Sequence, residues 1–324
     1  MTQPQEVREA HPYFMYDAIQ DQPRAAQLML DTHRSGAREV AETLAAKKRI
    51  YLVGIGTSWH AALAAEHWFR GFAQGSPEVQ AWHSFEFCSY PPALSSDAAV
   101  VVISHRGTKT YSFLALELAK NSGAFTVAIT STNPGPRIQA ADLILNTVAQ
   151  ERSAAFTVSY TSALTVLALI STYLGGQTHP GLDSETMRSQ LGQVPGHISQ
   201  ALFQEPDIRE AVEKFLESRR FLCTGWGPNT ANAYEMALKM KETSTVDCEG
   251  FQTEQLLHGP FCSVDQSCLM TLIAPPGPGY ERSLDIARAC EAVGATPPAI
   301  TPFSWSKRMP IGLPPDHSSA LSTM

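Results

Sequence analysis

Residues 49–58 read RIYLVGIGTS, an apolar run of β-forming residues that ends in a glycine-bearing turn and leads into a helical pattern. A second stretch of this kind, RFLCTGWGPN at residues 220–229, lies 171 positions further along the chain. Later segments keep the same register, and three matched elements indicate that one strand–turn–helix unit occurs twice. The further matches are residues 100–104 with 270–274 and residues 123–130 with 294–301.

The repeat indicates duplicated domains rather than a solenoid, because a copy of roughly 150 residues can bury a core of its own. Short β-branched strands alternate with helical stretches in both copies. This alternation predicts two α/β domains, each a doubly wound parallel sheet of the flavodoxin-like type. The expected organisation is a helical lead-in at 1–48, a first domain at 49–180, a linker helix at 181–210 and a second domain at 211–324.

The hydrophobic periodicity also predicts individual elements. Strands are expected near 50–54, 79–82, 99–104, 125–130, 143–147, 220–224, 269–274 and 297–301. Helices are expected near 58–73, 110–122, 159–174, 185–204, 229–242, 253–258 and 280–293. The apolar helix that ends the first copy would have its counterpart beyond Met324, so we expect the second copy to be incomplete at its C-terminus, either because the helix was lost or because the sequence is truncated.

The amino-acid composition argues against several classes of function. With 44% hydrophobic and 17% charged residues the chain resembles an ordinary globular protein, and its net charge of −7 argues against nucleic acid as a partner. No signal peptide opens the chain, and the longest apolar stretch, 163–173, is too short to cross a membrane, so a cytoplasmic protein is expected. Six cysteines without metal-ligand spacing predict no metal site.

Two turns of the first copy could hold a phosphate. Gly56, Thr57 and Ser58 follow the first strand, where a glycine permits close approach and hydroxyls can donate to an anion. A third glycine and an acidic ribose contact are missing, so no nicotinamide cofactor is expected. The second turn follows the third strand and supplies hydroxyls, cations and a glycine at a helix start, although a solvated turn is the simpler alternative. Its residues are Ser104, His105, Arg106, Gly107, Thr108 and Lys109.

Residues suited to acid–base chemistry lie in the second copy. Glu235, Lys239 and Glu242 are spaced i, i+4 and i+7, so they share one face of a helix. His258 ends a short helix and is followed by Gly259 and Pro260. Read alone, the first group is an exposed ion-paired face and the histidine is structural. Beside a phosphate site they become candidate acids and bases.

Together these motifs resemble the sugar isomerase (SIS) superfamily, and most closely the isomerase half of the glutamine–fructose-6-phosphate aminotransferases. The resemblance covers roughly residues 14 to 300 and is most specific at 235–260. It rests on Gly56-Thr57-Ser58, the Ser104 turn, Glu235-x-x-Leu238-Lys239-x-Lys241-Glu242-x-Ser244 and His258-Gly259-Pro260.

The resemblance implies an enzyme without cofactor that moves a proton between C1 and C2 of a sugar 6-phosphate. Glu242 would be the general base, Lys239 would stabilise charge on oxygen, and Glu235 would orient hydroxyls or the lysine. His258, supplied by the neighbouring subunit of a homodimer with shared active sites, would open the sugar ring. Substrate and phosphate would be held by residues of both turns, from Gly56 to Ser58 and from Ser104 to Lys109.

Some positions depart from the family pattern. Arg106 and Lys109 stand where a serine and a threonine are usual, which keeps an anion site but leaves the sugar open. Thr2 stands where the aminotransferases have a nucleophilic cysteine, so glutamine-dependent activity is not expected. An isomerase or amino-sugar-phosphate deaminase is therefore the main hypothesis. The alternative is a non-catalytic SIS module that binds a sugar phosphate as a sensor or regulatory subunit.

Overall fold

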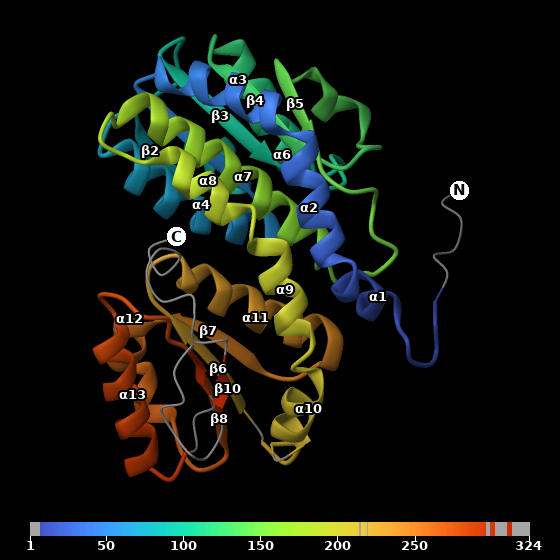
Figure 1. The fold of residues 1–324 in the computed structure, drawn as a ribbon, viewed down its shortest axis with the longest axis vertical. Coiled ribbons are helices and arrows are strands. Elements are labelled where there is room, and N and C mark those ends of the chain that lie inside the picture. The colour runs from blue at the N-terminus through green and yellow to red at the C-terminus, as the bar shows by residue number, and fades with distance from the viewer. Residues whose placement is uncertain (1–6, 214, 219, 296–298, 302–309, 313–324) are drawn as a thin grey trace. The chain divides into compact units, whose positions relative to one another are not determined.

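The structure is a computed structural model that describes residues 7–213, 215–218, 220–295, 299–301 and 310–312 (Figure 1). The chain divides into two compact units, Met1–Ile198 and Ser199–Met324. Each unit contains one parallel β-sheet. The C-terminal end of the second copy, residues 313–324, lies outside the described residues.

Unit 1 has a five-stranded sheet in the order β2-β1-β3-β4-β5, with every pair parallel. This is the flavodoxin-like strand order, in which the chain reverses direction across the sheet between β1 and β3. The strands are β1 (Arg49–Gly54), β2 (Glu78–His83), β3 (Ala98–Ile103), β4 (Phe125–Thr130) and β5 (Leu143–Asn146). The helices are α1 (Phe14–Gln20), α2 (Gln22–Thr32), α3 (Arg34–Ala45), α4 (Thr57–Ala73), α5 (Ser84–Ser89), α6 (Thr110–Asn121), α7 (Val158–Thr178), α8 (Ser184–Leu191) and the 3₁₀ turn η1 (Pro136–Ala140).

Helices cover both faces of the first sheet. Neighbouring residues of a strand point to opposite faces, so each strand contributes side chains to two cores. Ile50 and Leu52 join a core with α2, α3, α4 and α7, whereas Tyr51 and Val53 join a second core with α5, α6 and η1. In Figure 1, α7 lies beside α3 (blue), and α8 (yellow-green) packs against α7. The predicted doubly wound architecture is therefore confirmed.

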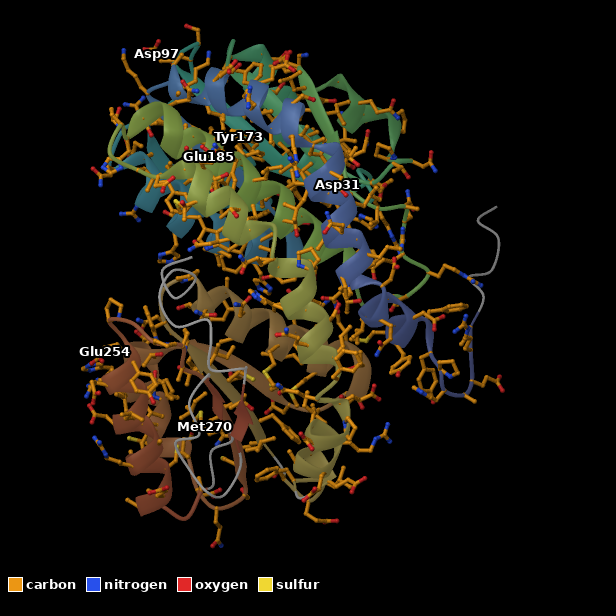
Figure 2. All side chains as sticks on the ribbon, viewed as in Figure 1. Asp31, Asp97, Tyr173, Glu185, Glu254 and Met270 are labelled. Atoms are coloured by element: carbon orange, nitrogen blue, oxygen red, sulfur yellow. The ribbon has the colours of Figure 1, made fainter. Side chains whose placement is uncertain are left out.

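Unit 2 repeats this topology. Its strands are all parallel in the order β10-β9-β8-β6-β7, which is the order of the first sheet when counted from the unit's own first strand. Met270, labelled in Figure 2, lies in the middle of this sheet. The strands are β6 (Arg220–Gly225), β7 (Cys248–Gln252), β8 (Cys268–Ile273), β9 (Ala299–Thr301) and β10 (Pro310–Gly312). The helices are α10 (Glu205–Glu213), α11 (Asn229–Ser244), α12 (Thr253–Leu257), α13 (Tyr280–Ala292) and the 3₁₀ turn η2 (Pro260–Ser263).

Glycines at matched positions give the two copies of the strand–turn–helix unit the same backbone geometry. A Cβ at Gly54 would lie 2.3 Å from the carbonyl oxygen of Ser58, and one at Gly225 would lie 2.3 Å from that of Asn229. Side chains are therefore excluded where each first strand passes the first turn of its helix. Two residues later Gly56 and Gly227 both have positive φ, 58° and 55°. The repeat in the sequence thus reflects one backbone geometry used twice.

Two expectations were wrong in detail. The single helix predicted at 185–204 is two helices, α8 and α9 (Val194–Leu202), interrupted by a turn at Gly192 and Gln193. Strand β7 was not predicted, because its glycine and glutamate hide the apolar alternation. Applying the repeat offset to the strand expected at 79–82 would have found it.

Helix α7 is longer than the apolar stretch that predicted it. Its 21 residues make it the one helix of the described chain with the length and hydropathy to cross a membrane, but 83% of its most apolar window is buried inside the protein. Serines and threonines of this helix bond back to its own carbonyls, as Ser162 does to Val158 at 2.7 Å. Burial of this kind is typical of a core helix in a globular protein.

Candidate functional site

The first glycine turn and the Ser104 turn meet in one small pocket of unit 1. Thr57 and Ser58, at the start of α4, and His105, just after β3, all line it. These positions follow the carboxyl ends of neighbouring strands, where parallel sheets place their ligand sites. The pocket therefore brings together three of the nine predicted substrate-binding residues. Gly56, Ser104 and residues 106–109 do not line it.

Phe156 closes this pocket. Its ring lies edge-on to His105, with centroids 5.2 Å apart, and 4.9 Å from the guanidinium carbon of Arg106. The remaining cavity is about 20 Å³, which holds a water molecule but not a phosphate. A phosphate at this turn would therefore need Phe156 to move, or would bind outside the pocket along residues 106–109.

His105 is a neutral group in this pocket. Its Nε2 accepts a hydrogen bond from the backbone N–H of Glu151 at 3.3 Å, so the ring proton of the neutral form belongs on Nδ1. Burial, together with the nearby charge of Arg106, lowers the pKa of His105 to about 4. The buried Nδ1 has no partner among the residues that the structure describes. His105 can therefore donate a hydrogen bond to a ligand but does not add a positive charge at neutral pH.

Glu151 supports the pocket and was missed by sequence reasoning. Its carboxylate accepts hydrogen bonds from the N–H groups of Thr157 (3.0 and 3.1 Å) and Ser159 (2.7 Å), which cap the start of α7. The backbone N–H of Glu151 donates the hydrogen bond to His105 Nε2. Six residues separate Glu151 from the helix start, which is too far for a recognisable capping pattern. No local signal could have identified it.

The Ser104 turn is fixed by its backbone. Thr130 donates its hydroxyl to the Ser104 carbonyl at 2.7 Å, and Ser104 is only 3% exposed. Gly107 has φ +63°, and a Cβ there would lie 2.6 Å from Ile138. The backbone of the turn is therefore bonded to β4 at Ser104, and a side chain is excluded at position 107.

Because His105 is neutral, Arg106 and Lys109 are the cationic residues of this turn. Within the described part of the chain, no carboxylate lies within 4.0 Å of either side chain. Lys109 and Thr108 are exposed, and Lys109 stands at the N-cap position of α6. Cations without a carboxylate partner in a turn that leads into a helix are suited to an anion, and the phosphate site stays a prediction.

In unit 2, Lys239 links the two glutamates of α11. Its Nζ lies 2.6 Å from Glu242 Oε2 and 3.3 Å from Glu235 Oε1. The lysine side chain is 15% exposed and that of Glu242 is 37% exposed, while Glu235 is buried. The three side chains thus form one cluster, more enclosed than the exposed ion-paired face that the sequence also allowed.

The position of Glu242 along α11 was not anticipated. It stands thirteen residues beyond Asn229, about 20 Å from the helix start at the rise of an α-helix. Only the beginning of α11 therefore lies at the carboxyl edge of the second sheet. The rule that ligands bind at this edge does not account for Glu242.

His258 is exposed and lies apart from this cluster. Its side chain is 70% exposed, and Nε2 lies 2.9 Å from Glu254 Oε1. Glu254, at the surface of α12 in Figure 2, is also held by Arg282 at 2.7 and 3.0 Å. Hydrogen bonds from Arg282 and then His258 lower the pKa of Glu254 to about 2.

Helices α11 and α12 cover opposite faces of the second sheet. Ala233 and Ala237 of α11 pack with Cys223, whereas Leu256 of α12 packs with Leu222, the neighbouring strand residue. Within one chain the sheet therefore lies between the helix that carries Glu242 and the helix that ends at His258. The structure does not bring these two predicted catalytic residues together in unit 2.

Comparison with known proteins places these features in a family. A family model described as the SIS domain matches residues 43–172. The glutamine–fructose-6-phosphate aminotransferase (isomerizing) of Thermococcus kodakarensis is 30% identical over 291 residues, which are 89% of this chain and 48% of that protein. The same enzyme of Aquifex aeolicus is 29% identical over 273 residues, 84% of this chain and 45% of its own length. The chain thus spans about half the length of the curated relatives that it matches.

Solved structures share the fold. The C-terminal domain of glucosamine-fructose-6-phosphate aminotransferase from Francisella tularensis has a TM-score of 0.81 at 19% identity, covering 91% of this chain and 85% of that one. Tagatose-6-phosphate ketose/aldose isomerase from Escherichia coli has a TM-score of 0.78 at 21% identity, covering 99% and 90%. The chain is a SIS-domain protein that resembles the isomerase domain of the glutamine–fructose-6-phosphate aminotransferases.

Proposed function

We propose that this chain is a cytoplasmic phosphosugar isomerase or amino-sugar-phosphate deaminase that shifts a proton between C1 and C2 of a ketose or aldose 6-phosphate. The observation that carries the proposal is the cluster of Lys239 between Glu235 and Glu242. A carboxylate held beside an ammonium group combines a proton acceptor with a group that can stabilise negative charge on oxygen.

In the proposed reaction Glu242 takes the proton from C2 of the aldose, or from C1 of the ketose, and returns it to the other carbon. The electron pair left on carbon forms the double bond of a cis-enediol, or of an enamine for an amino sugar, and a proton passes between the groups on C1 and C2 as the new carbonyl or imine forms. In the deaminase, water then adds to the C2 imine and ammonia leaves. Lys239 stabilises the developing charge on the sugar oxygen, and Glu235 orients the lysine. No cofactor is needed, because the carbon skeleton is neither oxidised nor reduced overall.

Phosphate binding is proposed for unit 1. Arg106 and Lys109 supply charge that no described carboxylate neutralises, and the Thr57, Ser58 and His105 side chains supply hydrogen-bond donors around the pocket. Gly56, Ser104, Gly107 and Thr108 shape the two turns.

We further propose that the protein acts as a homodimer in which His258 serves the active site of the partner subunit. The placement of α11 and α12 on opposite faces of the second sheet supports this arrangement. His258 is exposed at the surface of its own unit, as a residue offered to another chain would be. Its role would be to open the sugar ring by proton transfer.

One observation favours the second candidate, a sensor that binds a sugar phosphate without turnover. Phe156 fills the pocket at the Ser104 turn and leaves room for a single water. A pocket that opens only on binding is suited to reporting a ligand to a partner. A sensor, however, has no need for the cluster on α11.

The two candidates are separated by incubating the purified protein with fructose 6-phosphate, with and without ammonium, and with glucosamine 6-phosphate, and following the products by mass spectrometry. Calorimetric titration with the same sugars measures binding. An isomerase or deaminase converts at least one of them. Binding without conversion of any sugar in the panel would instead support the sensor.

A further inference from the structure

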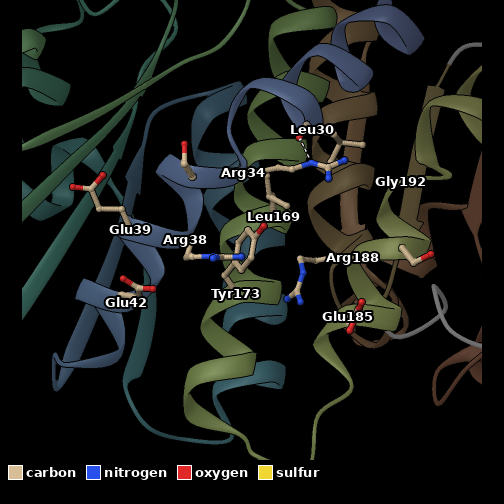
Figure 3. Close-up of a pocket in the computed structure, with 12 residues that line it drawn as sticks. Leu30, Arg34, Arg38, Glu39, Glu42, Leu169, Tyr173, Glu185, Arg188 and Gly192 are labelled. Carbon is tan, nitrogen blue, oxygen red and sulfur yellow. Dashed lines mark hydrogen bonds between the residues drawn. The ribbon is translucent and has the colours of Figure 1, made fainter.

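A second polar groove lies in unit 1, on the side of the sheet covered by α2, α3, α7 and α8 (Figure 3). Its volume is about 840 Å³, within the range of pockets that bind small organic ligands. On α7 its residue Tyr173 stands thirteen positions beyond Tyr160 of the small pocket, about 20 Å along the helix. The groove is therefore separate from the proposed sugar-phosphate site.

Two arginines contact Tyr173 in this groove, and a third, Arg34, lines it near Leu30. The guanidinium carbons of Arg38 and Arg188 lie 5.4 and 4.7 Å from the centre of the tyrosine ring. Figure 3 shows Arg38 reaching the ring from α3 and Arg188 approaching from α8. Arg34 donates through Nε to the Leu30 carbonyl at 3.3 Å, which leaves its two terminal nitrogens available.

These arginines leave nearby ion pairs unformed. Glu42 is four residues after Arg38 on α3, and Glu185 is three residues before Arg188 on α8, spacings at which helical ion pairs commonly form. No glutamate that lines the groove lies within 4.0 Å of its arginines. Elsewhere in the same unit such pairs do form, as between Arg70 and Glu66 at 3.5 Å.

Three guanidinium groups in one groove repel one another, and Glu39, Glu42 and Glu185, which line the same groove without pairing directly with them, offset only part of that repulsion. An anion bound among the guanidinium groups would remove that repulsion and accept several charge-assisted hydrogen bonds, and each added negative charge on the anion would strengthen both effects. The groove is large enough for a ligand with more than one phosphate. The overall charge of −7 disfavours an extended nucleic acid as its occupant.

We propose that this groove is a second anion site, which binds a small ligand carrying at least two phosphate groups. Arg38 and Arg188 hold the phosphates from two helices, Tyr173 positions both guanidinium groups by cation–π contact, and Arg34 adds a third donor. Glu185 and the other glutamates of the groove can accept hydrogen bonds from hydroxyl groups of an organic ligand.

Isothermal titration of the full chain with pyrophosphate, at low salt, tests this site. Wild-type protein is expected to bind, and Arg38→Gln and Arg188→Gln are each expected to bind about tenfold more weakly or worse, the loss typical of a charge-assisted bond. Arg70→Gln is the matched control, because it removes a cation from α4 outside the groove, and it should bind as wild type. Thermal unfolding confirms that each variant is folded, and placing the two test variants on different helices guards against a local folding defect.

The same titration is carried out with ADP and with orthophosphate. Tighter binding of ADP than of pyrophosphate would identify a nucleotide-like ligand, and equal binding would indicate recognition of the phosphates alone. The proposal is overturned if wild type shows no binding at millimolar pyrophosphate, or if Arg38→Gln and Arg188→Gln bind as wild type does. It is also overturned if only Arg106→Gln loses binding, which would place the anion at the Ser104 turn.

The oligomeric state gives a further outcome. If the groove variants change the oligomeric state, and wild type binds no pyrophosphate, the groove is a subunit interface and the proposal is overturned.

Discussion

His105 shows how burial decides the chemistry of a single residue. From the sequence it was one of a row of polar residues in a turn, suited to contact a phosphate. Its environment lowers its pKa to about 4, chiefly through burial and then through Arg106. A histidine that stays neutral recognises a ligand through its N–H direction rather than through charge. The positive charge of this turn therefore comes from Arg106 and Lys109.

This shift makes stability depend on pH. Because the folded-state pKa of His105 lies below its unfolded value, the unfolded chain binds the proton first, and stability falls as pH drops from about 6.5 towards 4. Between pH 7.5 and pH 5 His105 is expected to remove about 2 kcal/mol from the free energy of unfolding. His105→Gln keeps an acceptor for the Glu151 N–H but cannot titrate. Denaturant unfolding at the two pH values should show a correspondingly smaller loss in this variant; an equal loss in both proteins would mean that His105 is not the titrating group.

Arg106 and Lys109 give the second prediction at this scale. Arg106→Gln and Lys109→Gln should each weaken binding of a sugar phosphate by roughly 1–3 kcal/mol, since each removes a charge-assisted bond. Lys48→Gln is the control, because Lys48 pairs with Asp97 just before β3, at the opposite edge of the sheet. If calorimetric titration gives the same affinity for all three variants, the anion site lies elsewhere.

At the scale of elements, the sequence predicted what depends on short-range pattern. Apolar strands followed by glycine turns located β1 and β6, and the helical lead-in expected at 1–48 contains α1, α2 and α3. The interruption at Gly192 between α8 and α9 was not predicted, because both sides carry helical patterns. The cap on α7 from Glu151 depends on a loop that folds back, which no local periodicity encodes. The roles proposed for the site residues stay predictions for the same reason.

Glycine substitutions test the repeated turn. Gly54→Ala should lower the free energy of unfolding by about 3 kcal/mol or more, because the new Cβ would meet backbone atoms of Ser58 that have no room to move. Gly71→Ala, in α4, meets no atom within 4 Å and should raise stability by up to about 1 kcal/mol. Thermal or denaturant unfolding measures both. Similar effects at the two positions would show that Gly54 is not needed for close approach.

At the scale of the whole molecule, the sequence predicted the duplication correctly, and both sheets have the flavodoxin-like strand order. The homodimer with shared sites stays a prediction, which the opposite placement of α11 and α12 on the second sheet supports. Light scattering on the purified protein measures the oligomeric state directly, and a dimer is expected.

Mixing two inactive variants tests the shared site. Glu242→Gln and His258→Asn should each be inactive alone. After unfolding and refolding together, random pairing would restore about a quarter of wild-type activity, because half of the dimers would carry one intact site of two. If the mixture refolds but recovers no activity, both residues act within one chain; activity of His258→Asn alone would show that His258 is not catalytic.

The central claim, that Glu242 moves a proton between C1 and C2, is tested most directly by solvent exchange. The protein is incubated in deuterated water with the sugar phosphate that it converts, or with fructose 6-phosphate if conversion is slow, and deuterium at C1 and C2 is measured by mass spectrometry and NMR. Wild type and Glu249→Gln, which changes an exposed carboxylate on β7, should incorporate deuterium at these carbons. Glu242→Gln should lose incorporation by at least a hundredfold while binding the sugar within a few-fold of wild type. Undiminished exchange in Glu242→Gln would contradict the account.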